Sequence, residues 1–113
     1  MTDCLFCRIV AGEVPAELVH ETATTLAFRD VAPQAPVHVL VVPRAHHADV
    51  GALSDADPAV LADVLSAAVA VARAEGLDDG YRVVANTGRD GGQTVHHLHL
   101  HVLGGRGLSW PPG

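Results

Sequence analysis

The stretch Gly91-Gly92-Gln93-Thr94-Val95-His96-His97-Leu98-His99-Leu100-His101-Val102-Leu103-Gly104-Gly105 organises the rest of this chain. In an extended chain, successive side chains face opposite sides, which puts three histidines in one row: His97, His99 and His101. The other side takes His96 and three apolar residues suited to a core: Leu98, Leu100 and Val102. The sequence therefore predicts a half-buried strand that carries three imidazoles on the surface opposite its core.

This concentration of histidine favours chemistry over a plain surface. The chain has 8 histidines in 113 residues, and half of them fall at positions 96–101. A solvent-facing strand would more often carry Thr, Lys or Glu. A cluster that only binds metal is a second alternative. We favour phosphate or acyl chemistry over both.

Composition limits the class of protein. At 113 residues the chain predicts one domain, residues 1–113, and its core is rich in Val, Ala and Leu because 49% of residues are hydrophobic and only 4% aromatic. A formal net charge of −6 argues against a partner such as nucleic acid, but it leaves room for a small anion held by backbone N–H groups and histidines. No apolar run approaches the roughly 20 residues of a membrane span.

The start of the chain has neither the charge nor the apolar region of a signal peptide, so we expect a cytoplasmic protein without a structural disulfide.

Local patterns predict a helix, a hairpin, a buried strand, a long helix and a further strand. The short helix spans residues 4–12, with Asp3 as its cap and Gly12 at its end. The strands are expected at 18–21, 25–29, 37–42 and 81–85, and the loop 86–93 is rich in glycine. His38 is the polar residue of the apolar strand 37–42, and it is either a hydrogen-bonded core histidine or a functional one.

The long helix predicts a homodimer. Asp57 suits its N-cap, Pro58 its first position and Gly76 the residue past its end. Between residues 59 and 74 the apolar side chains cover far more than one stripe, so a single sheet cannot bury them all. We expect a second copy of the chain to cover the remainder.

The glycine-rich loop and the histidine row together predict a covalent mechanism. Glycines let backbone N–H groups approach an anion, and Thr94 adds a hydroxyl at the end of the loop. A neutral imidazole such as His99 is a competent nucleophile near pH 7, and its attack on phosphorus gives an adduct that water can open.

The segment Gly92-Gln93-Thr94-Val95-His96-His97-Leu98-His99-Leu100-His101 resembles the His-x-His-x-His-x-x motif of the histidine triad (HIT) superfamily. With the ending Trp110-Pro111-Pro112-Gly113, the likeness is closest to the Hint branch of nucleoside phosphoramidate hydrolases. The resemblance implies an α+β HIT-like fold: an antiparallel five-stranded sheet with one long and one short helix, the sheet being extended across a homodimer. In this branch the tail, about residues 104–113, reaches the partner subunit.

The resemblance also implies roles for single residues. His99 would be the nucleophile, His97 and His38 a proton-relay line behind it, and His101 the ligand of the α-phosphate. Thr94, which stands where the branch often has Ser, would assist the leaving group. Asp30 would accept the ribose hydroxyls. The purine would lie among Val14, Phe28 and Val31, with Phe6 and Ile9; the phosphate rim would be completed by Asn86, Gly92 and Gln93; and Trp110 would enter the partner's site.

Cys4-x-x-Cys7 is consistent with three interpretations. Positions i and i+3 share a helix face, as two metal thiolates require. A redox pair lacks its usual strand-to-helix context, and two buried thiols are the third alternative. The resemblance to HIT proteins with such a start implies a structural zinc completed by His46 and His97, although His47 could replace His46. No cofactor is then required for catalysis, and a zinc ligand at His97 conflicts with its relay role.

The function implied is hydrolysis of the P–N bond of adenosine or guanosine 5′-phosphoramidates through a nucleotidyl-histidine, releasing the nucleoside monophosphate. The alternatives are a dinucleoside polyphosphate hydrolase and a nucleotide-binding regulatory module without catalysis.

Overall fold

The computed structural model describes residues 3–113, which form three helices and five strands. In chain order these are α1 (Leu5–Val10), β1 (Leu18–Glu21), β2 (Thr25–Arg29), β3 (Val37–Pro43), α2 (Val50–Ala56), α3 (Pro58–Ala74), β4 (Tyr81–Ala85) and β5 (Leu100–Gly104). None of the helices in this part of the chain is long and apolar enough to cross a membrane.

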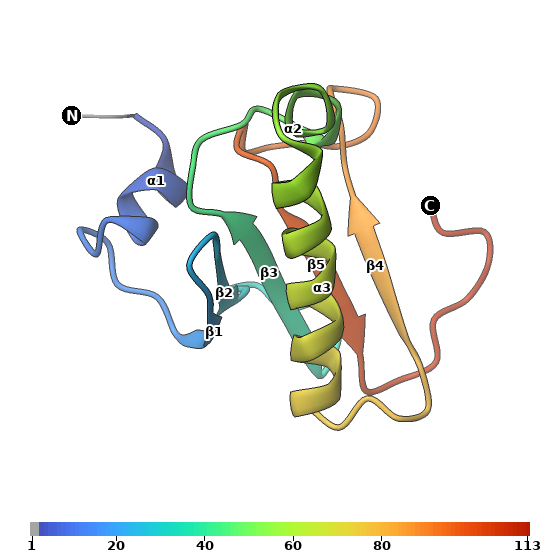
Figure 1. Cartoon of the computed structure of the whole chain (residues 1–113). Coiled ribbons are helices and arrows are strands. Elements are labelled where there is room, and N and C mark those ends of the chain that lie inside the picture. The colour runs from blue at the N-terminus through green and yellow to red at the C-terminus, as the bar shows by residue number, and fades with distance from the viewer. Residues whose placement is uncertain (1–2) are drawn as a thin grey trace.

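The five strands form one antiparallel sheet in the order β1-β2-β3-β5-β4 (Figure 1). β3 lies at its centre, and its pairing with β5 sets His38 opposite Leu103 and Leu40 opposite His101. Since side chains alternate along a strand, His38, Leu40 and His101 share one face of the sheet. The antiparallel five-stranded fold expected from the sequence is confirmed.

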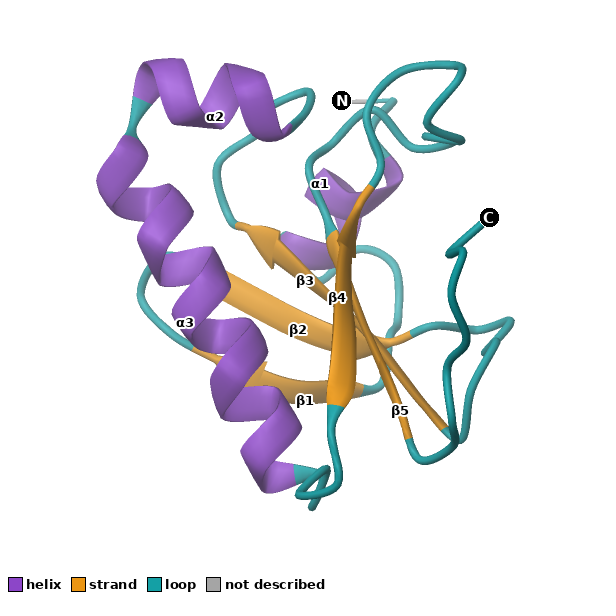
Figure 2. Ribbon diagram, turned by 90° about the vertical axis from the view of Figure 1, so that its right-hand side faces the viewer, coloured by secondary structure: helices purple, strands orange, loops and turns teal. Residues whose placement is uncertain are grey.

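The two faces of the sheet have separate apolar clusters. On one face α3 lies along the sheet and buries residues such as Val39, Val41 and Val102 (Figure 2). On the other face Phe6 of α1 packs against Phe28 and Leu40. This double cover explains the almost uninterrupted apolar sequence of β3.

α3 confirms the expected long helix, because Asp57 accepts a hydrogen bond from the N–H of Val60 and Pro58 occupies the first turn. α2 was not predicted: it is seven residues long, contains Gly51 and buries only Leu53, so it has no clear helical pattern. Its side-chain cap comes from Asp49, which binds the N–H of Ala52.

Four expectations about α1 and the histidine row were wrong. α1 is capped by Cys4, whose Sγ accepts from the N–H of Cys7, and not by Asp3. The strand of the histidine row begins only at Leu100, because residues 95–97 bend, and His96 is exposed instead of sharing the leucine side. The row is also not a surface: His97 is fully buried and His99 is 6% exposed.

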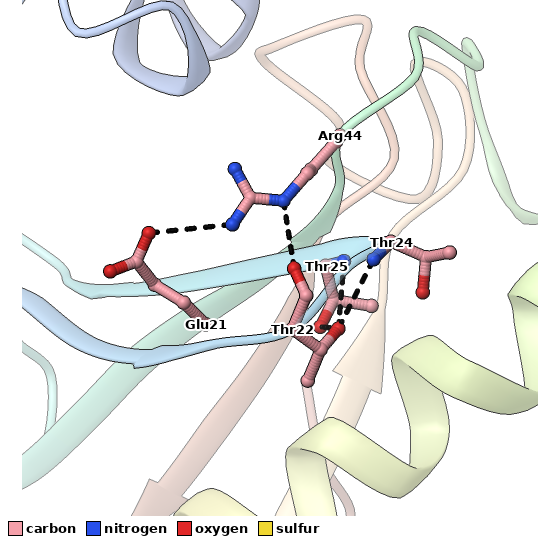
Figure 3. A network of polar contacts seen from close by, with 5 residues as sticks. All are labelled: Glu21, Thr22, Thr24, Thr25 and Arg44. Atoms are coloured by element: carbon pink, nitrogen blue, oxygen red, sulfur yellow. Dashed lines mark hydrogen bonds and ion pairs between the residues drawn. The ribbon is translucent and has the colours of Figure 1, made fainter.

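A polar network fixes the chain where it leaves β3 (Figure 3). The Nε of Arg44 donates to the carbonyl of Thr22 at 2.9 Å, and its Nη2 lies 3.3 Å from the carboxylate of Glu21. The main-chain N–H of Arg44 also binds the carbonyl of Thr24, in the turn between β1 and β2. These contacts hold the residues that follow, and therefore help to place His46.

Candidate active site and metal cluster

A cavity of about 290 Å³ opens on the α1 face of the sheet, beside the histidines. Its walls are mainly apolar, and its polar groups come from Arg29 at the end of β2, the β2–β3 loop, the segment before β5 and β5 itself. The structure brings together these residues expected at the site: Phe6, Ile9, Val14, Phe28, Asp30, Val31, Thr94, His99 and His101. An apolar cavity with a few convergent polar groups is the usual form of a small-molecule site.

His99 is oriented by the backbone. Its Nδ1 lies 2.8 Å from the carbonyl oxygen of His97, and a carbonyl only accepts, so Nδ1 carries the proton. The lone pair of the neutral ring is therefore on Nε2. Phe6 packs edge-on against this ring, with centroids 5.0 Å apart, and helps to hold it. These contacts fix the orientation of the His99 ring at the cavity wall.

His38 and His101 form a hydrogen-bonded pair. The Nε2 of His38 lies 2.9 Å from the Nδ1 of His101, and the Nδ1 of His38 accepts the N–H of Gln34. Burial lowers the pKa of His38, and burial together with His99 and His38 lowers the pKa of His101 to about 4. Both rings are therefore neutral at pH 7.

Asp30 lies at the mouth of this pair. One carboxylate oxygen accepts the N–H of Ala32 at 2.8 Å, and the other lies 3.4 Å from the Nε2 of His38. Each carboxylate oxygen has two lone pairs, so Asp30 retains capacity to accept hydroxyl groups. Val31, beside it, is fully exposed.

The glycine-rich loop is braced by Gln93. Its Oε1 accepts the N–H of Gly88, and its Nε2 donates to the carbonyls of Ala48 and Val95. The main-chain N–H of Gln93 binds Gly88, and that of Gly92, where φ is +80°, binds Arg89.

The main-chain amides of Gly92 and Gln93 were expected at the phosphate. Instead, they donate to carbonyls within the loop. Thr94 lines the main cavity, and Asn86 lines a neighbouring cavity that also includes His38 and His101.

Four potential metal ligands converge between α1 and the segment before β5. The ligand atoms of Cys4, Cys7, His46 and His97 all lie within 4.8 Å of one another. Both cysteines are thiols, and burial together with a hydrogen bond to Cys4 raises the pKa of Cys7 to about 11. The geometry selects His46 over His47, because the Nδ1 of His46 lies 3.4 Å from the Sγ of Cys7.

The distances suit a tetrahedral zinc ion. The Nδ1 of His97 is 3.3 Å from the Sγ of Cys4 and 3.5 Å from that of Cys7. Zinc bonded to sulfur at about 2.3 Å and to nitrogen at about 2.0 Å separates such atoms by about 3.5 Å. The Nε2 of His97 donates to the carbonyl of Pro43, which leaves Nδ1 free to ligate. A Cys₂His₂ donor set fits the metal.

His97 therefore faces the cysteines and not the cavity. The expected relay line from His97 to His38 is replaced by the contact between His38 and His101. His97 contacts His99 through its main-chain carbonyl, which accepts a hydrogen bond from the Nδ1 of His99.

A second cluster with metal-ligand atoms consists of Asp30, His38 and His101. His38 accepts the Gln34 amide on Nδ1, so its Nε2 carries the proton of the neutral ring and has no lone pair for a metal. This cluster is a hydrogen-bond chain and not a metal centre.

Trp110 is 81% exposed and lies outside the walls of both cavities, whereas Pro112 and Gly113 line the neighbouring one.

Sequence reasoning missed Leu40, Val95 and the three backbone groups that orient histidines, which are the Gln34 amide and the carbonyls of Pro43 and His97. Leu40 could have been found, since it lies two residues from His38 in the same strand. The backbone groups have no sequence signal.

Comparisons with known proteins identify the family of this chain. The model of the HIT domain family matches residues 11–108. An uncharacterized HIT-like protein of Synechococcus elongatus is 52% identical over 111 residues, which are 98% of this chain and 97% of that protein.

Two solved structures extend the comparison. The crystal structure of a HIT family hydrolase from Legionella pneumophila Philadelphia 1 is 51% identical, covers 98% of this chain and 100% of its own, and has a TM-score of 0.94. The crystal structure of a histidine triad nucleotide-binding protein from Candida albicans is 34% identical in sequence. It covers 96% of this chain and 83% of its own, and has a TM-score of 0.83.

Proposed function

The chain belongs to the HIT domain family, and on that premise we propose that it hydrolyses the P–N bond of purine nucleoside 5′-phosphoramidates. The observation that carries this proposal is the orientation of His99, whose Nδ1–H binds the carbonyl of His97 and whose Nε2 lone pair is free at the cavity. The names of the Legionella and Candida relatives, a hydrolase and a nucleotide-binding protein, support it.

The reaction has two steps. The Nε2 of His99 attacks phosphorus, the P–N bond breaks, and the amine leaves with a proton from solvent while the Thr94 hydroxyl hydrogen-bonds its nitrogen. The His97 carbonyl stabilises the positive charge that the ring of His99 gains. Water then attacks phosphorus and displaces His99, which releases the nucleoside monophosphate.

The substrate is held by the groups around the cavity. We assign the α-phosphate to His101 and Thr94 and the ribose hydroxyls to Asp30. The purine is assigned to the apolar wall, which includes Phe6, Ile9, Val14, Phe28 and Val31.

A structural zinc at Cys4, Cys7, His46 and His97 is part of the proposal, supported by the donor set and its distances. When bound, zinc would keep the two thiols ionised and anchor α1, and it takes no part in the reaction. The thiol form of both cysteines suits a reducing compartment, on which basis we propose a cytoplasmic location.

We also propose a homodimer whose tails exchange between subunits. β4 is an edge strand, and its Tyr81 and Val83 are 41% and 37% exposed on the face that carries α3. Leu65 of α3 is 48% exposed. Exposed apolar side chains at an open sheet edge favour pairing with a second copy.

Replacement of the nucleophile tests the function. With a purine nucleoside phosphoramidate as substrate, we expect His99→Ala to lower kcat by at least about 10³-fold, because no other group supplies the covalent step. His96→Ala is the matched control, since His96 is exposed and outside the site, and it should retain activity. Mass spectrometry of quenched wild-type enzyme should detect a nucleotidyl group on His99. Full turnover by His99→Ala would refute the assignment.

The same assay separates the alternatives. Turnover of a diadenosine polyphosphate, without turnover of the phosphoramidate, would make the protein a dinucleoside polyphosphate hydrolase. Nucleotide binding without turnover of either would make it a regulatory module. The orientation of His99 favours catalysis, since a binding module needs no free imidazole lone pair at phosphorus.

A further inference from the structure

We propose that the main-chain N–H of Gln34 sets the direction of a hydrogen-bond chain that makes His101 a fixed donor to a bound anion. This hydrogen-bond chain has two links. Gln34 N donates to the Nδ1 of His38 at 3.0 Å, and the Nε2 of His38 lies 2.9 Å from the Nδ1 of His101. Within residues 3–113, the Nε2 of His101 is buried without a hydrogen-bond partner.

The donor at one end of this hydrogen-bond chain determines which ring nitrogen carries each proton. A peptide nitrogen can only donate, so the Nδ1 of His38 is unprotonated and its neutral ring carries the proton on Nε2. That proton points at the Nδ1 of His101, which must accept it. The proton of neutral His101 is therefore on Nε2, the atom that lacks a partner. Asp30, 3.4 Å from the Nε2 of His38, is a second acceptor for the same proton and favours the same tautomer.

The pair has no position for an additional proton. A proton on the Nδ1 of His38 would meet the Gln34 N–H, and a proton on the Nδ1 of His101 would meet the Nε2–H of His38. Burial of both rings acts in the same direction. His38 and His101 therefore act as hydrogen-bond donors in series, and not as an acid that protonates the leaving group.

The open donor of His101 indicates its ligand. A buried polar group without a partner is rare in a folded protein, and an anionic oxygen is the strongest acceptor for it. That this oxygen belongs to the phosphate of a nucleotide rests on the proposed function, whereas the two tautomers do not depend on it.

Gln34 acts through its backbone and is a positioning residue. Its side chain donates to the carbonyl of Ala32, away from His38. Any residue with a peptide N–H can fill this role, and proline is the residue that cannot. Gln34→Pro therefore removes the donor, while Gln34→Ala keeps it and serves as the matched control.

Nitrogen-15 NMR of the histidine rings tests the tautomers in the wild-type chain near pH 7. We expect both His38 and His101 to carry their proton on Nε2, and addition of adenosine 5′-monophosphate, but not adenosine, to shift the Nε2–H of His101. A proton on the Nδ1 of either ring, or no shift with the monophosphate, would overturn the proposal. This measurement requires no turnover, so the proposal and the proposed hydrolase activity fail separately.

The variants test the origin of the tautomers. In Gln34→Pro we expect His38 to sample both tautomers and the affinity for the monophosphate to fall by up to about tenfold, the effect of one hydrogen bond. Gln34→Ala should keep the wild-type tautomers and affinity. A folded Gln34→Pro variant with an unchanged His38 tautomer would overturn the role of the amide. If that variant does not fold, the wild-type and Gln34→Ala spectra still decide the tautomers.

Discussion

At the scale of single residues, His97 has two contributions that a substitution can separate. Its ring faces the cysteines and Pro43, while its carbonyl orients His99. In His97→Gln the side-chain amide can still donate to Pro43, but the imidazole ligand is lost. We expect the zinc content to fall well below one per chain, and kcat to fall far less than in His99→Ala. A loss of kcat equal to that of His99→Ala would support a relay role for the ring.

His101 predicts a dependence of stability on pH. Its pKa is about 4 in the folded chain, below the roughly 6.5 of an unfolded histidine, so the unfolded state binds more protons between these values. The contribution of His101 to the free energy of unfolding is complete above about pH 6.5. It is lost as the pH falls towards about 4, by up to about 3 kcal/mol.

Urea denaturation between pH 7.5 and 4.5 measures this loss, with a chelator present so that metal release does not contribute. The same series on His101→Asn is the control. An equal slope in the variant would contradict the assignment to His101.

At the scale of elements, α1 is short and depends on contacts outside itself. Its six residues supply Phe6 to the cavity wall, and Cys4 and Cys7 tie it to the segment before β5. An isolated helix of this length is not stable in water. The Cys/His cluster therefore couples the position of α1 to the shape of the cavity.

Replacement of the thiols tests this coupling. In Cys4→Ser/Cys7→Ser we expect zinc to be absent, the melting temperature to fall and the affinity for a nucleoside monophosphate to weaken, because α1 loses its anchor. Elemental analysis, thermal unfolding and titration calorimetry measure the three effects. Less than about a tenth of a zinc per wild-type chain, with reduced thiols, would refute the site itself.

The elements also show how much of the fold could be predicted from the sequence. The hairpin β1–β2, β3 and α3 were predicted from periodicity and caps, because each is decided by its own residues. The Cys/His cluster was expected from the resemblance, and geometry then chose His46 over His47.

The bend at residues 95–97 could not be predicted, because it depends on contacts between distant segments. The N–H of Leu98 binds the carbonyl of His47, and the ring of His97 turns to Cys4 and Cys7. The bond from the Nε2 of Gln93 to the carbonyl of Ala48 likewise joins segments that are distant in the sequence.

At the scale of the whole molecule, the open edge of β4 predicts two chains per particle. Light scattering at micromolar concentration should give the mass of a dimer for wild type, and of one chain for Val83→Lys, which adds a charge among the exposed apolar side chains at that edge. Val31→Lys is the control for a charge placed on an exposed valine elsewhere. A wild-type mass of one chain would refute the dimer.

The sole tryptophan gives an independent readout of the same prediction. Trp110 is 81% exposed in one chain, so its fluorescence should be that of a water-exposed indole in Val83→Lys. If the tail of each chain enters the partner's site, wild-type emission should be shifted to shorter wavelength. Identical spectra would contradict the exchange of tails.

The two contributions of His97 bear on how such a chain can change over generations. Every residue type has the carbonyl that orients His99, whereas only a few side chains can ligate zinc. Mutations could therefore remove the cysteines and then the ring at position 97 while the nucleophile keeps its acceptor. On the proposed function, the Cys/His cluster can be lost in descent without loss of the chemistry, whereas His99 has no comparable freedom.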